Sequence, residues 1–123
     1  MSRLLRITAA TILMAAAPAF AADIDPAVVF DMGGKFDKSF NEGVYNGVEK
    51  FKKETGIAYK EFEVTNETQR EQALRRMAQR GSNVVISVGF AQAEPLKKVA
   101  AEFPKTKFTI IDGVVELPNV QSV

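Results

Sequence analysis

The sequence contains no cysteine and no histidine. The lack of cysteine excludes disulfides, thiol catalysis and cysteine-rich metal sites. The lack of histidine excludes the Ser–His and Cys–His nucleophile pairs and most zinc sites. We therefore expect no metal and no cofactor, and any catalysis would depend on carboxylates or lysine. These absences favour a binding protein over the common hydrolase designs.

Net charge is also almost absent, because the formal value is only +1 over the 123 residues. Such a balance gives no indication of a nucleic acid or an anionic membrane as the partner. The chain is 46% hydrophobic and 25% charged, which is the composition of an ordinary globular protein. We expect a small-molecule ligand rather than a polyanionic one.

The first 21 residues have the features of a signal peptide. Arg3 and Arg6 precede an apolar run that is too short to span a bilayer, and the segment ends in a small-x-small pattern. We predict cleavage between Ala21 and Ala22. Since no cysteine follows that position, we expect a periplasmic protein that is not a lipoprotein and has no direct membrane anchor.

Apolar runs of strand length alternate with amphipathic helices along the rest of the chain. We expect strands at 27–31, 57–64, 83–88, 107–112 and 119–123, and helices at 39–55, 66–80 and 91–103. In the first helix, apolar residues recur at spacings of four, four and three from Phe40 to Phe51. Ser39 and Glu42 are predicted to form a capping box at its start.

This alternation with short connections predicts an α/β fold with a doubly wound parallel sheet. The expected strand order is 2-1-3-4-5, so the order reverses between the first and third strands. Ligands bind at such a switch point, beyond the carboxyl ends of the strands.

Polar and aromatic residues gather at those carboxyl ends. Asp31 ends the first strand, Gly89 and Phe90 follow the third, and Asp112 ends the fourth. Phe40 and Asn41 open the first helix. We predict a ligand cleft here, with three alternatives open: the acids could be loop caps, the phenylalanines could be core residues, and the acid pair could serve a glycosidase-like hydrolase.

The loop "MGGKFDKS" does not fit a phosphate site. Gly33 and Gly34 are adjacent with no third glycine at the dinucleotide spacing, and Asp37 precedes Lys38 and Ser39 where a Walker loop requires glycine. Ionised carboxylates only accept hydrogen bonds, so neutral polyols or ring N–H donors suit this loop better.

Two segments, "DMGGKFDKSFNEGVYNGVEKF" (31–51) and "SVGFAQAEPLKKVAAEFPKTKFTIIDGVVELPNVQSV" (87–123), resemble the basic-membrane-protein family of ABC-transporter substrate-binding proteins. The best understood members of that family are purine nucleoside receptors. The resemblance covers residues 27–123 and implies the type I periplasmic binding protein fold, in which two doubly wound lobes close over a ligand. It also implies a protein that is not an enzyme and that works with the membrane permease of an ABC importer.

The resemblance implies a ligand site formed by Asp31, Phe40, Asn41, Gly89, Phe90 and Asp112. Phe40 would stack on the base, with Asp31 and Asn41 hydrogen-bonded to its edge. Asp112 would hold the ribose hydroxyls, and Gly89 with Phe90 would line the same pocket.

The family continues beyond "PNVQSV" into a hinge and a second lobe. We therefore expect residues 22–123 to be an incomplete N-terminal lobe without the second lobe, in a fragment or a truncated product that binds nucleosides weakly. The alternatives are a different small ligand, such as a sugar or a flavin-like ring, a small periplasmic carboxylate-dependent hydrolase that uses Asp31 and Asp112, and an interaction protein.

Overall fold

The computed structural model describes residues 23–123, so the predicted signal peptide lies outside the described residues. The chain order is β1 (Pro26–Phe30), α1 (Phe40–Thr55), β2 (Lys60–Glu63), α2 (Gln69–Gln79), β3 (Val84–Val88), a 3₁₀ turn η1 (Phe90–Gln92), α3 (Ala93–Glu102), β4 (Lys107–Ile111) and β5 (Val120–Ser122).

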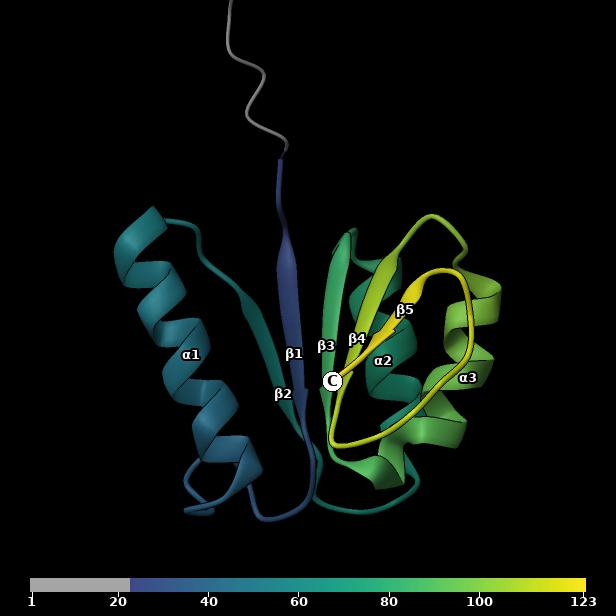
Figure 1. Cartoon of the computed structure of the whole chain (residues 1–123), viewed down its shortest axis with the longest axis horizontal. Coiled ribbons are helices and arrows are strands. Elements are labelled where there is room, and N and C mark those ends of the chain that lie inside the picture. Colours follow the sequence, from purple (N-terminus) through teal and green to yellow (C-terminus); the bar gives the residue numbers. More distant parts are fainter. Residues whose placement is uncertain (1–22) are drawn as a thin grey trace, which may run out of the picture.

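The five strands form one parallel sheet in the order β2-β1-β3-β4-β5 (Figure 1). This confirms the predicted α/β fold and the predicted strand order. In the register of the sheet, Val29 lies opposite Ser87, and Val88 lies opposite Ile111. The residues that follow β1, β3 and β4 therefore emerge at the same level along one edge of the sheet.

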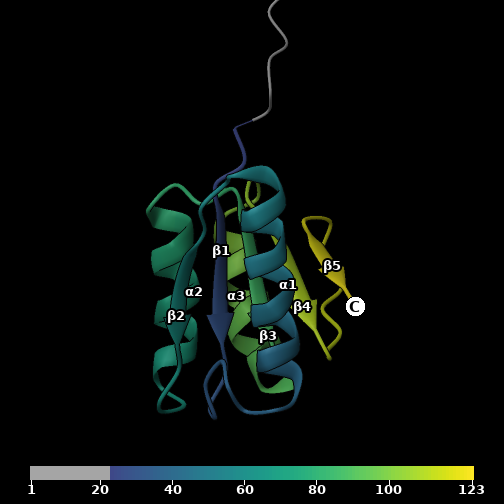
Figure 2. The ribbon, with the colours of Figure 1, turned by 90° about the vertical axis from the view of Figure 1, so that its left-hand side faces the viewer.

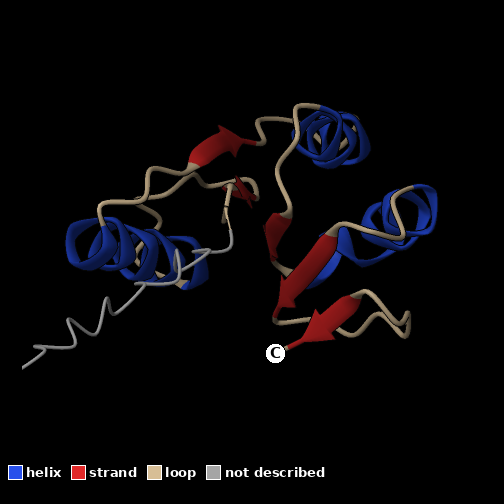
Figure 3. Cartoon of the chain, turned by 90° about the horizontal axis from the view of Figure 1, so that it is seen from above, coloured by secondary structure: helices blue, strands red, loops and turns tan. Residues whose placement is uncertain are grey.

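Helices cover both faces of the sheet, as a doubly wound fold requires. Seen from above, α1 lies on one face, and α2 and α3 lie together on the other (Figure 3). The side view shows α2 and α1 on opposite sides of β1 (Figure 2). Every residue of β1 is buried, because this central strand has neighbours on both edges and helices on both faces.

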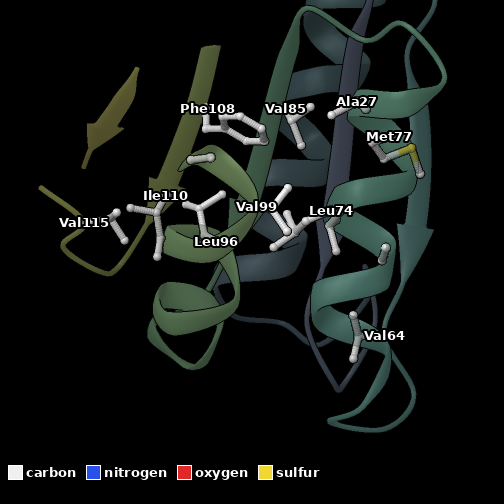
Figure 4. Packing of buried hydrophobic residues seen from close by; sticks show 14 residues of the cluster. Ala27, Val64, Leu74, Met77, Val85, Leu96, Val99, Phe108, Ile110 and Val115 are labelled. Atoms are coloured by element: carbon white, nitrogen blue, oxygen red, sulfur yellow. The ribbon is translucent and has the colours of Figure 1, made fainter. Parts of the chain in front are cut away.

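The larger hydrophobic core lies between the sheet and the pair α2–α3. Leu74 and Met77 of α2 and Leu96 and Val99 of α3 pack there against the sheet, where Phe108 points from β4 (Figure 4). Burying a side chain of this size stabilises the fold by about 1.5–3 kcal/mol. The packing of α2 and α3 against the sheet fixes the strands from which the loops at the carboxyl edge emerge.

A smaller core cluster lies under α1. It consists of Val28, Phe30, Val48 and Val88, with Val44 and Tyr45 packed against it. Because few large side chains contribute, α1 is held to the sheet less extensively than α2 and α3 are.

Several element boundaries differ from the predicted ones. β2 begins at Lys60 rather than at residue 57, and α2 begins at Gln69 rather than at residue 66. The later start of α2 has a local cause, because the side chain of Asn66 accepts a hydrogen bond from the Thr68 N–H (3.1 Å) and so stabilises a turn. Within residues 23–123 none of the helices has both the length and the apolar character of a membrane span.

Candidate functional site

A hollow of about 240 Å³ lies at the carboxyl edge of the sheet, where the strand order reverses. Ten residues line it: Asp31, Met32, Asp37, Phe40, Asn41, Val88, Gly89, Phe90, Ala91 and Asp112. All six residues that the sequence analysis predicted for the site are among them. The fold therefore assembles these residues from β1, α1, β3, η1 and β4, although they are up to 81 positions apart (112 − 31).

Asp31 leaves β1 and its carboxylate meets Arg70 of α2. The Arg70 Nε donates a hydrogen bond to Asp31 Oδ1 (2.9 Å), and Nη2 lies 3.4 Å from Oδ2. Both side chains are mostly buried, with 11% of Arg70 and 16% of Asp31 exposed. Arg70 was not among the residues predicted for the site. The predicted helix begins at residue 66 and places Arg70 beyond its first turn, so the sequence pattern gave no signal for this residue. The observed start at Gln69 brings Arg70 into the first turn, where its charge opposes the helix dipole.

Gly89 lies against the same carboxylate. Its φ is +96°, a conformation that strains other residues, and a Cβ at this position would come within 3.3 Å of Asp31 Oδ2. The backbone conformation therefore favours glycine strongly, and a larger residue would in addition crowd the Asp31 carboxylate. The turn after β3 can consequently pass directly beside Asp31.

Asn41 ties the start of α1 to the end of β1. Its side chain is almost completely buried; its Oδ1 accepts from the Asp31 N–H (3.0 Å), and its Nδ2 donates to the Asp31 carbonyl (3.2 Å) and to Asp37 Oδ2 (3.0 Å). Both amide hydrogens are used within the protein. Only the oxygen of Asn41 keeps a lone pair for a ligand donor.

The N-terminus of α1 is capped by Asp37, and the predicted capping box is wrong in its first residue. Asp37 Oδ1 accepts from the N–H groups of Ser39 (2.8 Å) and Glu42 (3.1 Å). The Ser39 side chain makes no capping hydrogen bond, whereas Glu42 does bond back to the loop, at the Lys38 N–H (2.9 Å). Asp37, three residues before the first residue of the helix, reaches these donors and takes the role expected of the serine.

These contacts also shift the acidity of Asp37. Burial alone would raise the pKa of its carboxyl, but the hydrogen bonds from Glu42, Ser39 and Asn41 hold the pKa below its ordinary value. Asp37 is therefore an ionised structural acid at neutral pH.

Two aromatic rings at the site are exposed. Phe40 is 56% and Phe90 is 73% exposed, and both line the hollow. The alternative that these rings belong to the core is therefore excluded. Large exposed apolar side chains beside a hollow are typical of a binding surface.

Asp112 has a positive φ of 60°, which is uncommon for a residue other than glycine. Within residues 23–123 no side-chain or backbone donor reaches its carboxylate, although its N–H donates to the Val123 carbonyl (2.8 Å). Of the three acids that line the hollow, Asp31 is paired with Arg70 and Asp37 caps a helix. Within the described part of the chain, Asp112 is therefore the acid at the hollow whose carboxylate meets no hydrogen-bond donor.

A second hollow, of about 410 Å³, lies beside the first and shares Phe40 with it. Its other lining residues are Ser39, Gly43, Val44 and Ile111, so it offers no charged group. The smaller hollow is the better candidate site because it combines apolar surface with a few converging polar groups. Among the described residues no three potential metal ligands lie close enough together to hold an ion.

The fold and the hollow define a parallel α/β protein with a ligand-sized site at its switch point. Residues 24–123 match the family model of PnrA-like ABC transporter substrate-binding proteins, and the chain belongs to this family. An uncharacterized lipoprotein of Pyrococcus abyssi is 35% identical over 88 residues, which cover 71% of this chain and 22% of that protein. The ABC transporter nucleoside-binding protein BmpA of Lactococcus lactis is 26% identical over 98 residues, or 76% of this chain and 28% of that protein.

Solved structures show the same fold. A solute-binding protein of an ABC transporter system from Aeropyrum pernix superposes with a TM-score of 0.74 and 31% identity, over 80% of this chain and 28% of that one. The predicted family resemblance is thereby confirmed. The chain spans between 22% and 28% of the length of these relatives.

The predicted localisation requires a correction. Three relatives from Pyrococcus species are named lipoproteins, and a lipoprotein is held at a membrane through its lipid. This finding overturns the expectation of an unanchored periplasmic protein that is not a lipoprotein. The expectation depended on the absence of a cysteine near Ala22, a position outside the described residues. The absence of that residue from this chain does not indicate how the relatives are held at a membrane.

Proposed function

We propose that this chain is part of the solute-binding component of an ABC importer and binds a purine nucleoside in the hollow at the switch point. The observation that carries the proposal is that one small hollow combines exposed aromatic rings with the carboxylate of Asp112, which meets no donor from residues 23–123. The Lactococcus lactis relative is named a nucleoside-binding protein, which supports this class of ligand.

The proposed binding mode assigns a role to each part of the hollow. The Phe40 ring stacks on the base, an interaction worth ~1–3 kcal/mol. Asp31, held by Arg70, accepts a hydrogen bond from the edge of the base, and Asn41 accepts through its remaining lone pair. Asp112 accepts from the ribose hydroxyls, while Gly89 and Phe90 line the pocket.

Binding without turnover fits this site better than hydrolysis does. A glycosidase needs one carboxyl group as an acid and a second as a base or nucleophile. Here Asp31 is committed to Arg70 and Asp37 to the helix N-terminus, which leaves Asp112 alone. We therefore propose a protein that is not an enzyme and that passes its ligand to a membrane permease.

We also propose that residues 22–123 belong to the N-terminal lobe of such a protein. The relatives are several times longer than the matched part, and in the complete protein a second lobe would supply the opposite wall of the cleft.

Equilibrium dialysis with adenosine, guanosine, adenine and ribose, followed by chromatography of the ligand, tests the proposal. We expect saturable binding of the two nucleosides, weaker binding of adenine, and recovery of the ligand unchanged. Release of free base and sugar would favour the hydrolase, and stronger binding of ribose than of adenosine would favour a sugar-binding protein.

A further inference from the structure

We propose that Arg70 is a positioning residue of the binding site. From α2, outside the hollow, it fixes the orientation of the Asp31 carboxylate. This inference rests on the proposed function, because it concerns how the same hollow recognises its ligand. Arg70 does not line the hollow, and it acts through Asp31 alone.

The geometry of the pair is that of a fork. Nε and Nη2 of Arg70 face the two different oxygens of Asp31, at 2.9 and 3.4 Å. A guanidinium that meets both oxygens restricts rotation of the carboxylate, which a single point charge cannot do. Arg70 therefore sets the direction of the remaining lone pairs of Asp31.

Gly89 confines the carboxylate on another side. A Cβ on Gly89 would lie 3.3 Å from Asp31 Oδ2, so the backbone after β3 already approaches this oxygen closely. The Asp31 backbone is fixed as well, through the two hydrogen bonds with Asn41. With its main chain held by Asn41 and its side chain held between Arg70 and Gly89, Asp31 presents one orientation to the hollow.

The position of Arg70 argues against a role in helix stability. It is the second residue of α2 (Gln69–Gln79), where a positive charge opposes the helix dipole. It is also largely buried, which is rare for an arginine unless it is paired. Arg75, on the same helix, instead forms surface ion pairs with Glu71 (2.8 Å) and Glu102 (2.7 Å).

The charges around the hollow give Arg70 a second effect on recognition. Asp31, Asp37 and Asp112 all line the hollow, and the lining residues include no base. Without Arg70 the Asp31 carboxylate would be an uncompensated negative charge among other acids, and nothing would fix which of its lone pairs face the hollow. The ligand would then meet a misdirected acceptor, so affinity should fall even where the fold is intact.

A double-mutant cycle on the whole chain tests this inference. The variants are Arg70→Met, which keeps the length of the side chain but removes the fork, Arg70→Lys, Asp31→Asn, and Asp31→Asn combined with Arg70→Met. Arg75→Met is the matched control, because it is the same substitution on the same helix but outside the site. NMR titration of the ¹⁵N-labelled chain measures the affinities for adenosine, adenine and ribose, and thermal unfolding of each variant is recorded separately.

We expect Arg70→Met to weaken the binding of adenosine and of adenine by the same factor, about tenfold, because Asp31 is assigned to the base. Ribose binding should not change. The affinities of the Arg70→Lys variant for adenosine and adenine should lie between those of Arg70→Met and those of the unchanged chain. In the Asp31→Asn background, Arg70→Met should have little further effect, because the group that it positions is already altered. Arg75→Met should leave all three affinities unchanged.

Two results would overturn the inference while leaving the proposed function intact. One is an adenosine affinity in Arg70→Met equal to that in Arg75→Met. The other is a loss that is the same with Asp31 and with Asn at position 31, which would show that Arg70 only stabilises the fold. If the unchanged chain shows no shift with any of the three ligands, the proposed nucleoside function fails, and this inference fails with it.

Discussion

At Asp112 the chain leaves β4 with a left-handed backbone, and this conformation decides which substitution can test the site. The left-handed region costs roughly 1–2 kcal/mol for residues other than glycine, asparagine and aspartate. Asp112→Ala would therefore change both the backbone and the carboxylate. Asp112→Asn tolerates the same φ and removes only the charge and part of the acceptor capacity.

We expect Asp112→Asn to reduce the preference for adenosine over adenine, because only the nucleoside offers ribose hydroxyls to this position. Titration of both ligands against both proteins measures the ratio of the affinities. Equal losses for adenosine and adenine would contradict the ribose assignment of Asp112.

The exposed ring of Phe40 can also be tested by substitution. Phe40→Ala should weaken binding of the base by ~1–3 kcal/mol, the value of one stacked ring, with little change in unfolding temperature. Phe36→Ala is the control, since Phe36 is also exposed but packs edge-on against Tyr45 (5.1 Å between ring centroids) and does not line the hollow. Similar affinities for the two variants would show that Phe40 is not the platform.

The sequence predicted which residues gather at the hollow, but not which hydrogen bonds they make with one another and with the rest of the protein. Asp31, Gly89 and Asp112 were found because a parallel sheet brings the carboxyl ends of its strands to one edge. Arg70 was missed, because its reach from α2 depends on a side-chain path that a pattern of spacings does not contain. The use of both Asn41 amide hydrogens within the protein also depends on loop geometry rather than on spacing.

At the scale of the elements, α1 depends on Asp37 for its N-terminus. Asp37→Ala should lower the free energy of unfolding by ~1 kcal/mol at neutral pH, as the loss of a capping residue does. Ser39→Ala should cost much less, because the Ser39 side chain forms no capping bond. Urea unfolding of the two variants distinguishes them, and a larger loss in Ser39→Ala would restore the predicted capping box.

The stabilisation of α1 by Asp37 should depend on pH with a definite sign. The pKa of Asp37 is lowered in the folded protein, so its contribution to stability is present above the pKa of the unfolded chain and is lost as the pH falls through the lower folded value. The difference in stability between Asp37→Ala and the unchanged chain should therefore shrink on acidification. A difference that is constant from neutral pH down into that acidic range would contradict the role of the ionised carboxylate.

Gln92 joins the ends of β1 and β3 at the switch point. Its buried Nε2 donates to the carbonyls of Val29 and Val88, both at 2.9 Å. Gln92→Leu should leave two carbonyls without this donor and lower the free energy of unfolding by roughly 1–3 kcal/mol. Urea denaturation measures the loss, and an unchanged midpoint would show that the two strand ends are held without this side chain.

At the scale of the whole molecule, the alternation of strands and helices was sufficient to predict the sheet and its order. The apolar runs and the short connections leave few arrangements that bury both faces of β1 (Pro26–Phe30). Boundaries were less accurate, because side chains such as Asn66 replace the first helical bonds with a turn. The predicted localisation was wrong, because it was inferred from the absence of cysteine, whereas three relatives from Pyrococcus are named lipoproteins.

The roles proposed for Asp31, Phe40 and Asp112 all require that a purine nucleoside binds in the hollow at the carboxyl edge of the sheet. Titration of the ¹⁵N-labelled chain with adenosine, observed residue by residue, tests it most directly. We expect saturable shifts of the backbone amides that surround the hollow, at Asp31, Phe40, Gly89, Phe90 and Asp112, with the ligand recovered intact. Shifts confined to another part of the chain, or no shift up to the solubility limit of adenosine, would contradict it.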